Sequence, residues 1–180
     1  IRYGTSNKID DGIEGMSVQF NQNGNLLYAL RRRLPPVIFK LNQSHAFCQF
    51  DADNYVNLCT MKSGCFVGDS DQVIFVFCQQ KSKYFHQYVA SGSDDFNVYI
   101  WRIPEIDETT NVESTQHQSS HLSSGIFIRK HQAKESYSLD HFVWNAHMIL
   151  RGHRSVVNQV RYSSGLHTIV SSGVEKLIKV

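Results

Sequence analysis

The sequence predicts an all-β protein, because short stretches of strand-forming residues alternate with turn-forming segments along much of the chain. The clearest pair is residues 88–90 and 98–100, which are rich in aromatic and β-branched side chains and flank turn-forming residues 91–97. Residues 16–20 show the alternation of apolar and polar side chains that is typical of a strand. These observations predict antiparallel hairpins as the repeating unit of the fold.

The composition is typical of one folded domain without a strongly charged ligand. Apolar residues make up 41% of the chain and charged residues 19%, which is sufficient to bury a core. The formal net charge of +2 is too small to indicate binding to nucleic acid or to an acidic membrane. No apolar run is long enough to cross a bilayer and no leader is recognised at the start, so we expect neither a membrane segment nor a signal peptide.

The cysteines indicate a reducing compartment. Cys48, Cys59, Cys65 and Cys78 are not arranged at the Cys-x-x-Cys spacing of a zinc site. They are more typical of buried strand thiols than of a disulfide framework. We therefore expect an intracellular protein, located in the nucleus, the cytoplasm or both.

The first sequence unit spans about residues 16–43 and is expected to be a three-stranded meander. Its first turn, residues 21–25, contains Gly24, which can supply the positive φ of a tight turn. Pro35 and Pro36 interrupt the strand pairing because proline has no amide donor. The predicted strands are residues 16–20, 26–30 and 37–41.

The second unit spans about residues 44–103 and contains the hairpin around residues 91–97. Residues 73–87 separate this hairpin from the strand before it, and a hairpin connection needs far fewer residues. Two interpretations remain open: residues 73–87 are an insertion, such as a translated retained intron, or they form a genuine additional strand. The remaining predicted strands of this unit are an outer strand at residues 45–50 and an inner strand at residues 61–67.

Residues 104–146 differ in composition from the rest of the chain, because they are largely polar. We expect them to form a flexible loop between two units. An apolar group near the end of this segment is expected to dock back onto the sheets. That group is Phe142, Val143 and Trp144.

The repeated features of the units resemble a WD repeat. The run from Ser91-Gly92 to Trp101 is similar to the end of such a repeat, and Gly152-His153 is similar to its beginning. Equivalent inner-strand ends fall at Phe20, Phe66 and Tyr162, and the first interval of about 46 residues is close to the ~40–45 residues of one WD repeat. The resemblance implies a partial WD-repeat β-propeller over residues 16–180. Its nearly three four-stranded antiparallel blades are expected at about residues 16–43, 44–103 and 147–180.

The same resemblance assigns structural roles to five residues. In WD repeats the turn aspartate, matched here by Asp95, bonds to a histidine in the preceding loop and ties the blade together. Trp101 matches the tryptophan at the end of the repeat. Gly152 and His153 match the glycine and histidine that open the third repeat. Glu175 matches Asp95 when the residues are counted back from the end of the strand, so we expect it to face His153.

Three longer segments resemble one group of WD-repeat proteins, the cullin-4-associated factors. The segments are residues 30–37, 57–63 and 92–104. The resemblance implies a non-enzymatic substrate receptor of a cullin-4 RING ubiquitin ligase. Its partners would be the damaged-DNA-binding adaptor and a ubiquitination target. That family often contacts its adaptor through Trp-Asp-x-Arg, a motif absent here because Arg102 follows Trp101.

A catalytic interpretation has less support, and we expect no catalytic residue, cofactor or metal. His117, His121 and His131 lie in the polar segment without a ligand spacing. The pair His153 and Glu175 could form a hydrolytic dyad, but no Gly-x-Ser-x-Gly nucleophile motif accompanies it. No phosphate-binding glycine motif is present either.

The sequence leaves two more questions open. The chain could be a general WD-repeat scaffold with no link to a ligase. The three consecutive arginines at residues 31–33 could contact a phosphate or an acidic partner, or they could form a solvated turn.

Overall fold

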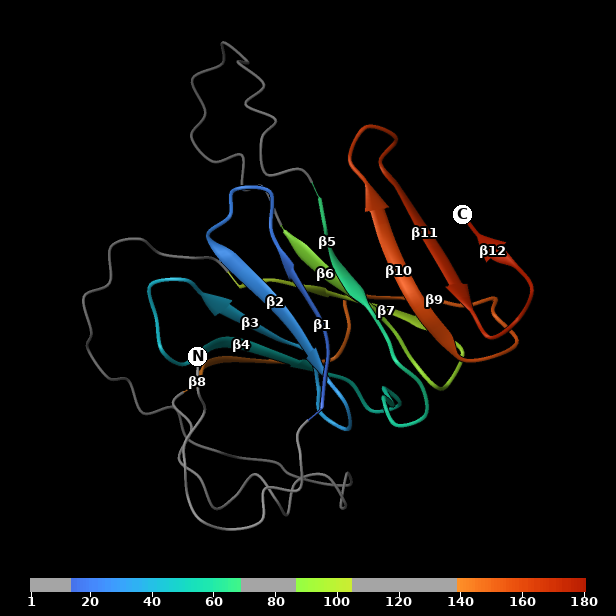
Figure 1. The fold of residues 1–180 in the computed structure, drawn as a ribbon, viewed down its shortest axis with the longest axis horizontal. Helices are drawn as coiled ribbons and strands as arrows, with labels where there is room; N and C mark the ends of the chain where they lie inside the picture. The colour runs from blue at the N-terminus through green and yellow to red at the C-terminus, as the bar shows by residue number, and fades with distance from the viewer. Residues whose placement is uncertain (1–13, 69–86, 105–138) are drawn as a thin grey trace.

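The computed structural model describes residues 14–68, 87–104 and 139–180, and all regular structure in these ranges is β-strand. The strands form three sheets that lie side by side (Figure 1). The order is β1-β2-β3-β4-β8 in the first sheet, β5-β6-β7-β9 in the second and β10-β11-β12 in the third. The all-β prediction and the partial propeller are therefore confirmed.

The strands of the first two sequence units fall close to the positions that the sequence predicts. The first sheet contains β1 (Gly15–Phe20), β2 (Leu26–Arg31), β3 (Val37–Lys40), β4 (Ala46–Asp51) and β8 (Leu139–Trp144). The second contains β5 (Gly64–Val67), β6 (Tyr88–Gly92), β7 (Val98–Arg102) and β9 (Met148–Leu150). The third contains β10 (Val157–Ser163), β11 (Thr168–Gly173) and β12 (Ile178–Lys179).

The β1–β2 turn shows how local sequence fixes a hairpin. Gly24 adopts φ 69°, a conformation that glycine reaches without steric cost. The side-chain carbonyl of Asn21 accepts a hydrogen bond from the amide of Leu26 at 2.9 Å, and its amide group donates to Asn25 at 2.7 Å. The turn therefore carries its own side-chain bonds, as asparagine-rich turns do.

The sheets are offset by one strand from the sequence units. β4, expected as the outer strand of the second unit, pairs with β3 of the first sheet, and β9 of the third unit pairs with β7. For β4 the reason is local, because a short turn joins β3 to β4, whereas a longer segment at 52–63 separates β4 from β5. The pairing of β9 has no such local reason, since residues 103–147 separate it from β7 and only residues 151–156 separate it from β10. Each of these sheets thus takes one strand from the beginning of the next unit.

The end of the polar segment is a strand and not a loop, which corrects the expectation for residues 104–146 at that point. β8 pairs in parallel with β4, and Cys48 lies opposite His141. His45 Nε2 and Asp140 Oδ1 approach to 2.9 Å beside this pairing. An unpaired β4 edge would leave backbone donors and acceptors exposed, and β8 satisfies them. Residues 105–138 of that segment and residues 73–86 of the suspected insertion lie outside the described residues.

Trp101 joins the first two sheets. Its side chain is fully buried, and its indole Nε1 donates to the carbonyl of Asp51 in the first sheet at 2.9 Å. The rings of Tyr99 and Tyr55 lie 5.6 and 5.2 Å from the Trp101 ring, the first stacked and the second edge-on. Such aromatic pairs add packing energy beyond the area that they bury.

The second and third sheets approach each other closely at Gly92. A Cβ atom placed on Gly92 would overlap the carbonyl oxygen of Val157, the first residue of β10. Gly64 is similarly confined, by the hydroxyl of Tyr28 and the carbonyl of Ala90. A second apolar cluster, formed by residues such as Val98, Val157 and Val160, fills the space beside this contact.

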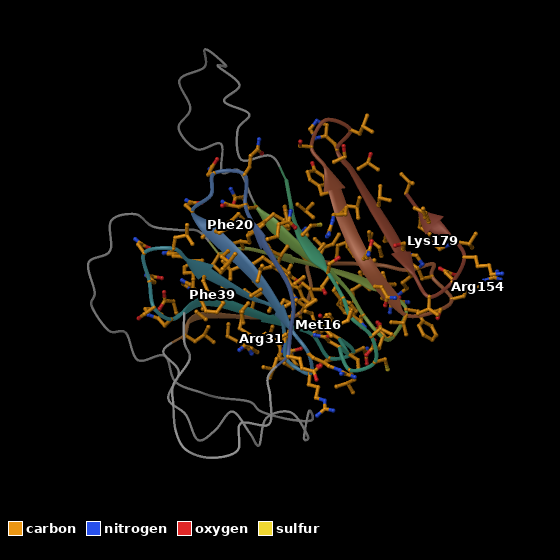
Figure 2. The ribbon with its side chains drawn as sticks, in the orientation of Figure 1. Met16, Phe20, Arg31, Phe39, Arg154 and Lys179 are labelled. Atoms are coloured by element: carbon orange, nitrogen blue, oxygen red, sulfur yellow. The ribbon has the colours of Figure 1, made fainter. Side chains whose placement is uncertain are left out.

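The outer sheets each leave apolar side chains exposed. In β1 the alternation expected for residues 16–20 is shifted by a bulge between Gly15 and Ser17, and Val18 and Phe20 are 70% and 56% exposed. Ile178 of β12 is exposed in the third sheet. Figure 2 shows Met16 and Phe20 at the two ends of β1. Exposed sheet faces on either side of the second sheet fit an open, partial propeller.

Candidate interaction surface

The strand connections form two rims, one at each end of the sheets. The turns after β1 and β10 lie at one end of the sheets, and the connections after β2, β4, β6, β9 and β11 lie at the other end (Figure 1). We call the second end the loop rim. It comprises residues 32–36, 52–63, 93–97, 151–156 and 174–177.

Residues 57–63, which we call the bridging segment, cross the loop rim and first contact the first sheet. The side-chain amide of Asn57 donates to the carbonyls of Arg31 and Leu34 at 2.7 and 3.2 Å. The backbone carbonyl of Asn57 accepts from the amide of Arg33 at 2.8 Å. Asn57 therefore holds the whole β2–β3 turn with one buried side chain.

The bridging segment next wraps around Asp94 of the second sheet. One carboxylate oxygen of Asp94 accepts from the amides of Leu58 and Cys59 at 2.5 and 2.9 Å. The other pairs with the ammonium of Lys62, whose side chain is fully buried. Burial opposes ionisation of Asp94, but these partners outweigh it and hold the pKa of the carboxyl below its usual value.

The end of the bridging segment contacts the third sheet. Thr60 Oγ1 donates to Asn158 Oδ1 at 2.5 Å. The amide of Ser63 donates to the carbonyl of Asn158 at 2.8 Å, and the carbonyl of Ser63 accepts from Val160 at 3.3 Å. The segment is thus bonded to all three sheets, which makes it a rigid part of the loop rim.

His153 and Glu175 lie together on the loop rim of the third sheet. His153 Nδ1 bonds to Glu175 Oε1, and Nε2 lies 2.8 Å from the hydroxyl of Ser171. Glu175 also accepts from the amide of Arg154 at 3.2 Å. Gly152 precedes them with φ 143°, a conformation that favours glycine.

Asp95 has partners different from the expected histidine. Its carboxylate accepts from Tyr99 Oη at 2.6 Å and from Asn97 Nδ2 at 2.7 Å, both within its own hairpin. The side chain that reaches the preceding loop is its neighbour Asp94. The sequence contains a signal for the role of Asp94. Counted forward from the pairs Ser91-Gly92 and Ser172-Gly173, Asp94 and Glu175 occupy the same position.

Tyr55 is a residue that sequence reasoning missed. Its hydroxyl lies 3.0 Å from the hydroxyl of Ser91 in β6, just as His153 lies beside Ser171 in β11. Tyr55 lies in the connection before β5 and bonds to β6. His153 lies in the connection before β10 and bonds to β11, so the two side chains have equivalent positions. A tyrosine therefore takes the place of the histidine in the second sheet.

The opposite rim holds a hollow of about 200 Å³. Phe20, Phe66 and Tyr162, which the sequence places at equivalent inner-strand ends, all line it. The three inner-strand ends that the sequence identifies as equivalent therefore lie around the same hollow.

The described residues carry little that resembles catalytic machinery. They contain no group of three or more His, Cys, Asp or Glu residues that could hold a metal ion, and no helix among them could span a membrane. Burial raises the pKa of Cys48 and of Cys65 to about 12, so both thiols stay protonated at neutral pH.

Sequence comparison agrees with the architecture. A family model described as "WD domain, G-beta repeat" matches residues 53–102, which include the bridging segment and the hairpin of β6 and β7. The match shows that residues 53–102 are similar to a WD repeat, and the sheets around them form a partial β-propeller.

Over all of its 180 residues the chain is 40% identical to "DDB1- and CUL4-associated factor 5" of Homo sapiens and 39% identical to the protein of that name in Mus musculus. It spans 14% of the length of these relatives. The resemblance to cullin-4-associated factors is confirmed.

Proposed function

We propose that this chain is part of a substrate receptor of a cullin-4 RING ubiquitin ligase, in which the propeller binds other proteins and performs no chemistry. The observation that carries the proposal is 40% identity over the whole chain to a protein whose name associates it with DDB1 and CUL4. The receptor holds a target protein near the ligase so that ubiquitin can be transferred to it.

The environment of His153 supports a binding function over hydrolysis. Both ring nitrogens are engaged, one by Glu175 and the other by Ser171, and only 3% of the side chain is exposed. A general base must reach the proton that it removes, so a histidine in this position is better suited to joining strands.

The adaptor contact is proposed to lie elsewhere in the full-length protein. Trp101 of β7 is followed by Arg102 and Ile103, and Ile103 is buried. This blade therefore lacks Trp-Asp-x-Arg.

The test uses full-length protein and purified DDB1 adaptor. We expect the two to elute as one complex from a size-exclusion column. If the full-length protein and the adaptor elute separately at micromolar concentration, the ligase proposal is wrong and the general WD-repeat scaffold becomes the better interpretation.

We further propose that the protein works in the nucleus, the cytoplasm or both. The support is the set of free thiols, of which Cys48 and Cys65 are buried within sheets. Fluorescence imaging of the tagged full-length protein tests this, and accumulation in the secretory pathway would contradict it.

A further inference from the structure

The first sheet carries one strand more than the four strands of a propeller blade. The extra strand is β8, which lies along the outer edge of β4 (Figure 1). In the second sheet β9 holds the position that β4 holds in the first, and within the described residues it pairs only with β7. The pairing of β8 is therefore an addition to a blade that already has its four strands.

The added strand is held less firmly than the strand beneath it. β8 runs parallel to β4, whereas all the other strand pairs in the described part of the chain are antiparallel, and parallel pairing is slightly weaker for each residue. None of the six residues of β8 is buried, while Phe47, Cys48 and Phe50 of β4 are at most 1% exposed. Elements with little burial open at a lower free energy than the core, so β8 can leave the sheet while the blade stays folded.

The connection from β8 to β9 provides a pivot for this opening. Only residues 145–147 join the two strands, although β8 pairs in the first sheet and β9 in the second. Asn145 adopts φ 77°, in the left-handed region that asparagine tolerates better than most residues, and its amide donates to the carbonyl of Asp51 at 3.0 Å. The chain changes direction at this anchored residue, so β8 can swing away while β9 stays paired with β7.

Side chains along β4 determine which sequence fits against it. Asp140 Oδ1 lies 2.9 Å from Nε2 of His45, which directly precedes β4. The next residue, His141, places its ring edge-on against Phe47, with 5.0 Å between the ring centroids. Val143 packs against the apolar cluster of the first two sheets. The strand that fits this edge thus has an acidic residue, then a ring, and then a β-branched apolar residue two positions further on.

We propose that the outer edge of β4 is a strand-addition site that β8 fills as a releasable strand, and that the site takes up an extended segment of a partner protein when β8 leaves. The partner segment runs parallel to β4 and carries the same pattern of an acidic residue, a ring and a β-branched residue. Backbone hydrogen bonds supply the affinity of such a site, and the side-chain pattern supplies its selectivity. Because β8 is tethered beside the site, it competes at a high effective concentration and keeps the edge closed by default. The inference does not depend on the ligase proposal.

Hydrogen exchange on the unmodified full-length protein tests whether β8 is releasable. We expect the amides of β8 that point toward β4 to exchange at least tenfold faster than the paired amides of β3, the strand on the other side of β4. If the amides of β8 are protected as strongly as those of β3, the strand does not leave and the proposal is overturned.

A peptide with the sequence of residues 138–145 tests whether the edge of β4 accepts a strand from outside. Val143→Pro in the full-length protein opens the site, because proline has no amide donor and interrupts a strand. We expect the labelled peptide to bind this variant at least tenfold more tightly than the wild type, measured by fluorescence anisotropy. A peptide that itself carries Val143→Pro is the control and should not bind. A peptide with Asp140→Lys should bind about threefold more weakly, and His45→Glu in the protein should restore its affinity.

Two peptide results overturn the proposal: no binding to a folded open variant, and equal binding to the open variant and the wild type, which would place the peptide elsewhere. Protection of the β3 amides shows whether Val143→Pro is folded. If it is not, Asp140→Lys in the protein is the milder opening variant, because it sets a lysine beside His45, and the same two results decide. Failure of the full-length protein to bind the adaptor would bear on the ligase proposal alone.

Discussion

At the scale of single residues, Phe96 combines an unfavourable backbone angle with an exposed ring. Its φ of 72° costs a residue with a Cβ atom about 1–2 kcal/mol relative to the right-handed region, whereas glycine avoids this cost. We predict that Phe96→Gly raises the free energy of unfolding by about 1 kcal/mol, measured by urea denaturation of the full-length protein. Phe96→Ala keeps the strain and is the control; an equal gain in both variants would contradict this explanation.

Asp94 is the residue whose loss should matter most on the loop rim. Asp94→Asn leaves the buried ammonium of Lys62 without its counter-charge, and we predict a loss of about 3 kcal/mol in the free energy of unfolding. The control is Asp95→Asn, because the carboxylate of Asp95 bonds to Asn97 and Tyr99 of its own hairpin, and its replacement should cost about 1 kcal/mol. If Asp94→Asn lowers the free energy of unfolding no more than Asp95→Asn does, the bridging segment does not depend on Asp94.

The lowered pKa of Asp94 also predicts how stability depends on pH. Its folded pKa lies below the unfolded value of about 4, so its contribution is fully present above that value and is lost as the pH falls through the folded pKa. We expect the wild type to lose more stability than Asp94→Asn between pH 5 and pH 3. Parallel pH profiles for the two proteins would contradict this prediction.

At the scale of elements, the packing of β6 against β10 depends on a missing side chain. Gly92→Ala would push a Cβ atom into the carbonyl of Val157, which cannot move without disturbing β10, and overpacking of this kind costs about 1–3 kcal/mol. Gly165→Ala, in the open turn between β10 and β11, is the matched control because nothing lies near its Cβ position. Thermal unfolding compares the two, and a melting temperature for Gly92→Ala that equals the control would mean that the sheets can shift apart.

The strands themselves could be predicted from sequence, but their partners only in part. Hairpin partners such as β6 and β7 follow from turn chemistry, because a short turn forces neighbouring strands to pair. The parallel addition of β8 to β4 has no such local signal, since a long segment separates them. The place of Trp101 at the end of its strand could be recognised from the sequence. The pairing of Asp94 with Lys62 could not, because it depends on the path of the bridging segment, and contacts with all three sheets determine that path.

At the scale of the whole molecule, the three sheets are joined by a few polar side chains as well as by apolar contact. Within the bridging segment, Asn57 bonds to the first sheet, the next two amides bond to Asp94 of the second sheet, and Thr60 bonds to Asn158 of the third. The loop rim should therefore move as one unit with the sheets. A surface with this rigidity suits a receptor that must hold a target in a fixed orientation.

The connection between β5 and β6 provides the last prediction. Val67 lies directly opposite Tyr88, so the chain leaves and re-enters the sheet at neighbouring positions, and a short turn would be sufficient to join them. Deleting residues 73–87 would leave residues 68–72 as a five-residue turn and would place Gln72 where Gln87 now accepts a hydrogen bond from the amide of Ile103. If residues 73–87 are an insertion, the deletion should keep the fold and shorten the loop by two doublings, a gain of about 1 kcal/mol.

The measurement is the melting temperature and the soluble yield of the full-length protein with and without residues 73–87. We expect both to rise, because residues 73–78 form an uncharged, strongly β-prone run of the kind that promotes aggregation when exposed. A matched deletion of fifteen residues, 109–123 in the polar segment, controls for the effect of shortening a connection. A lower melting temperature for the first deletion alone would show that residues 73–87 contain a genuine strand of the native sheet and are not an insertion.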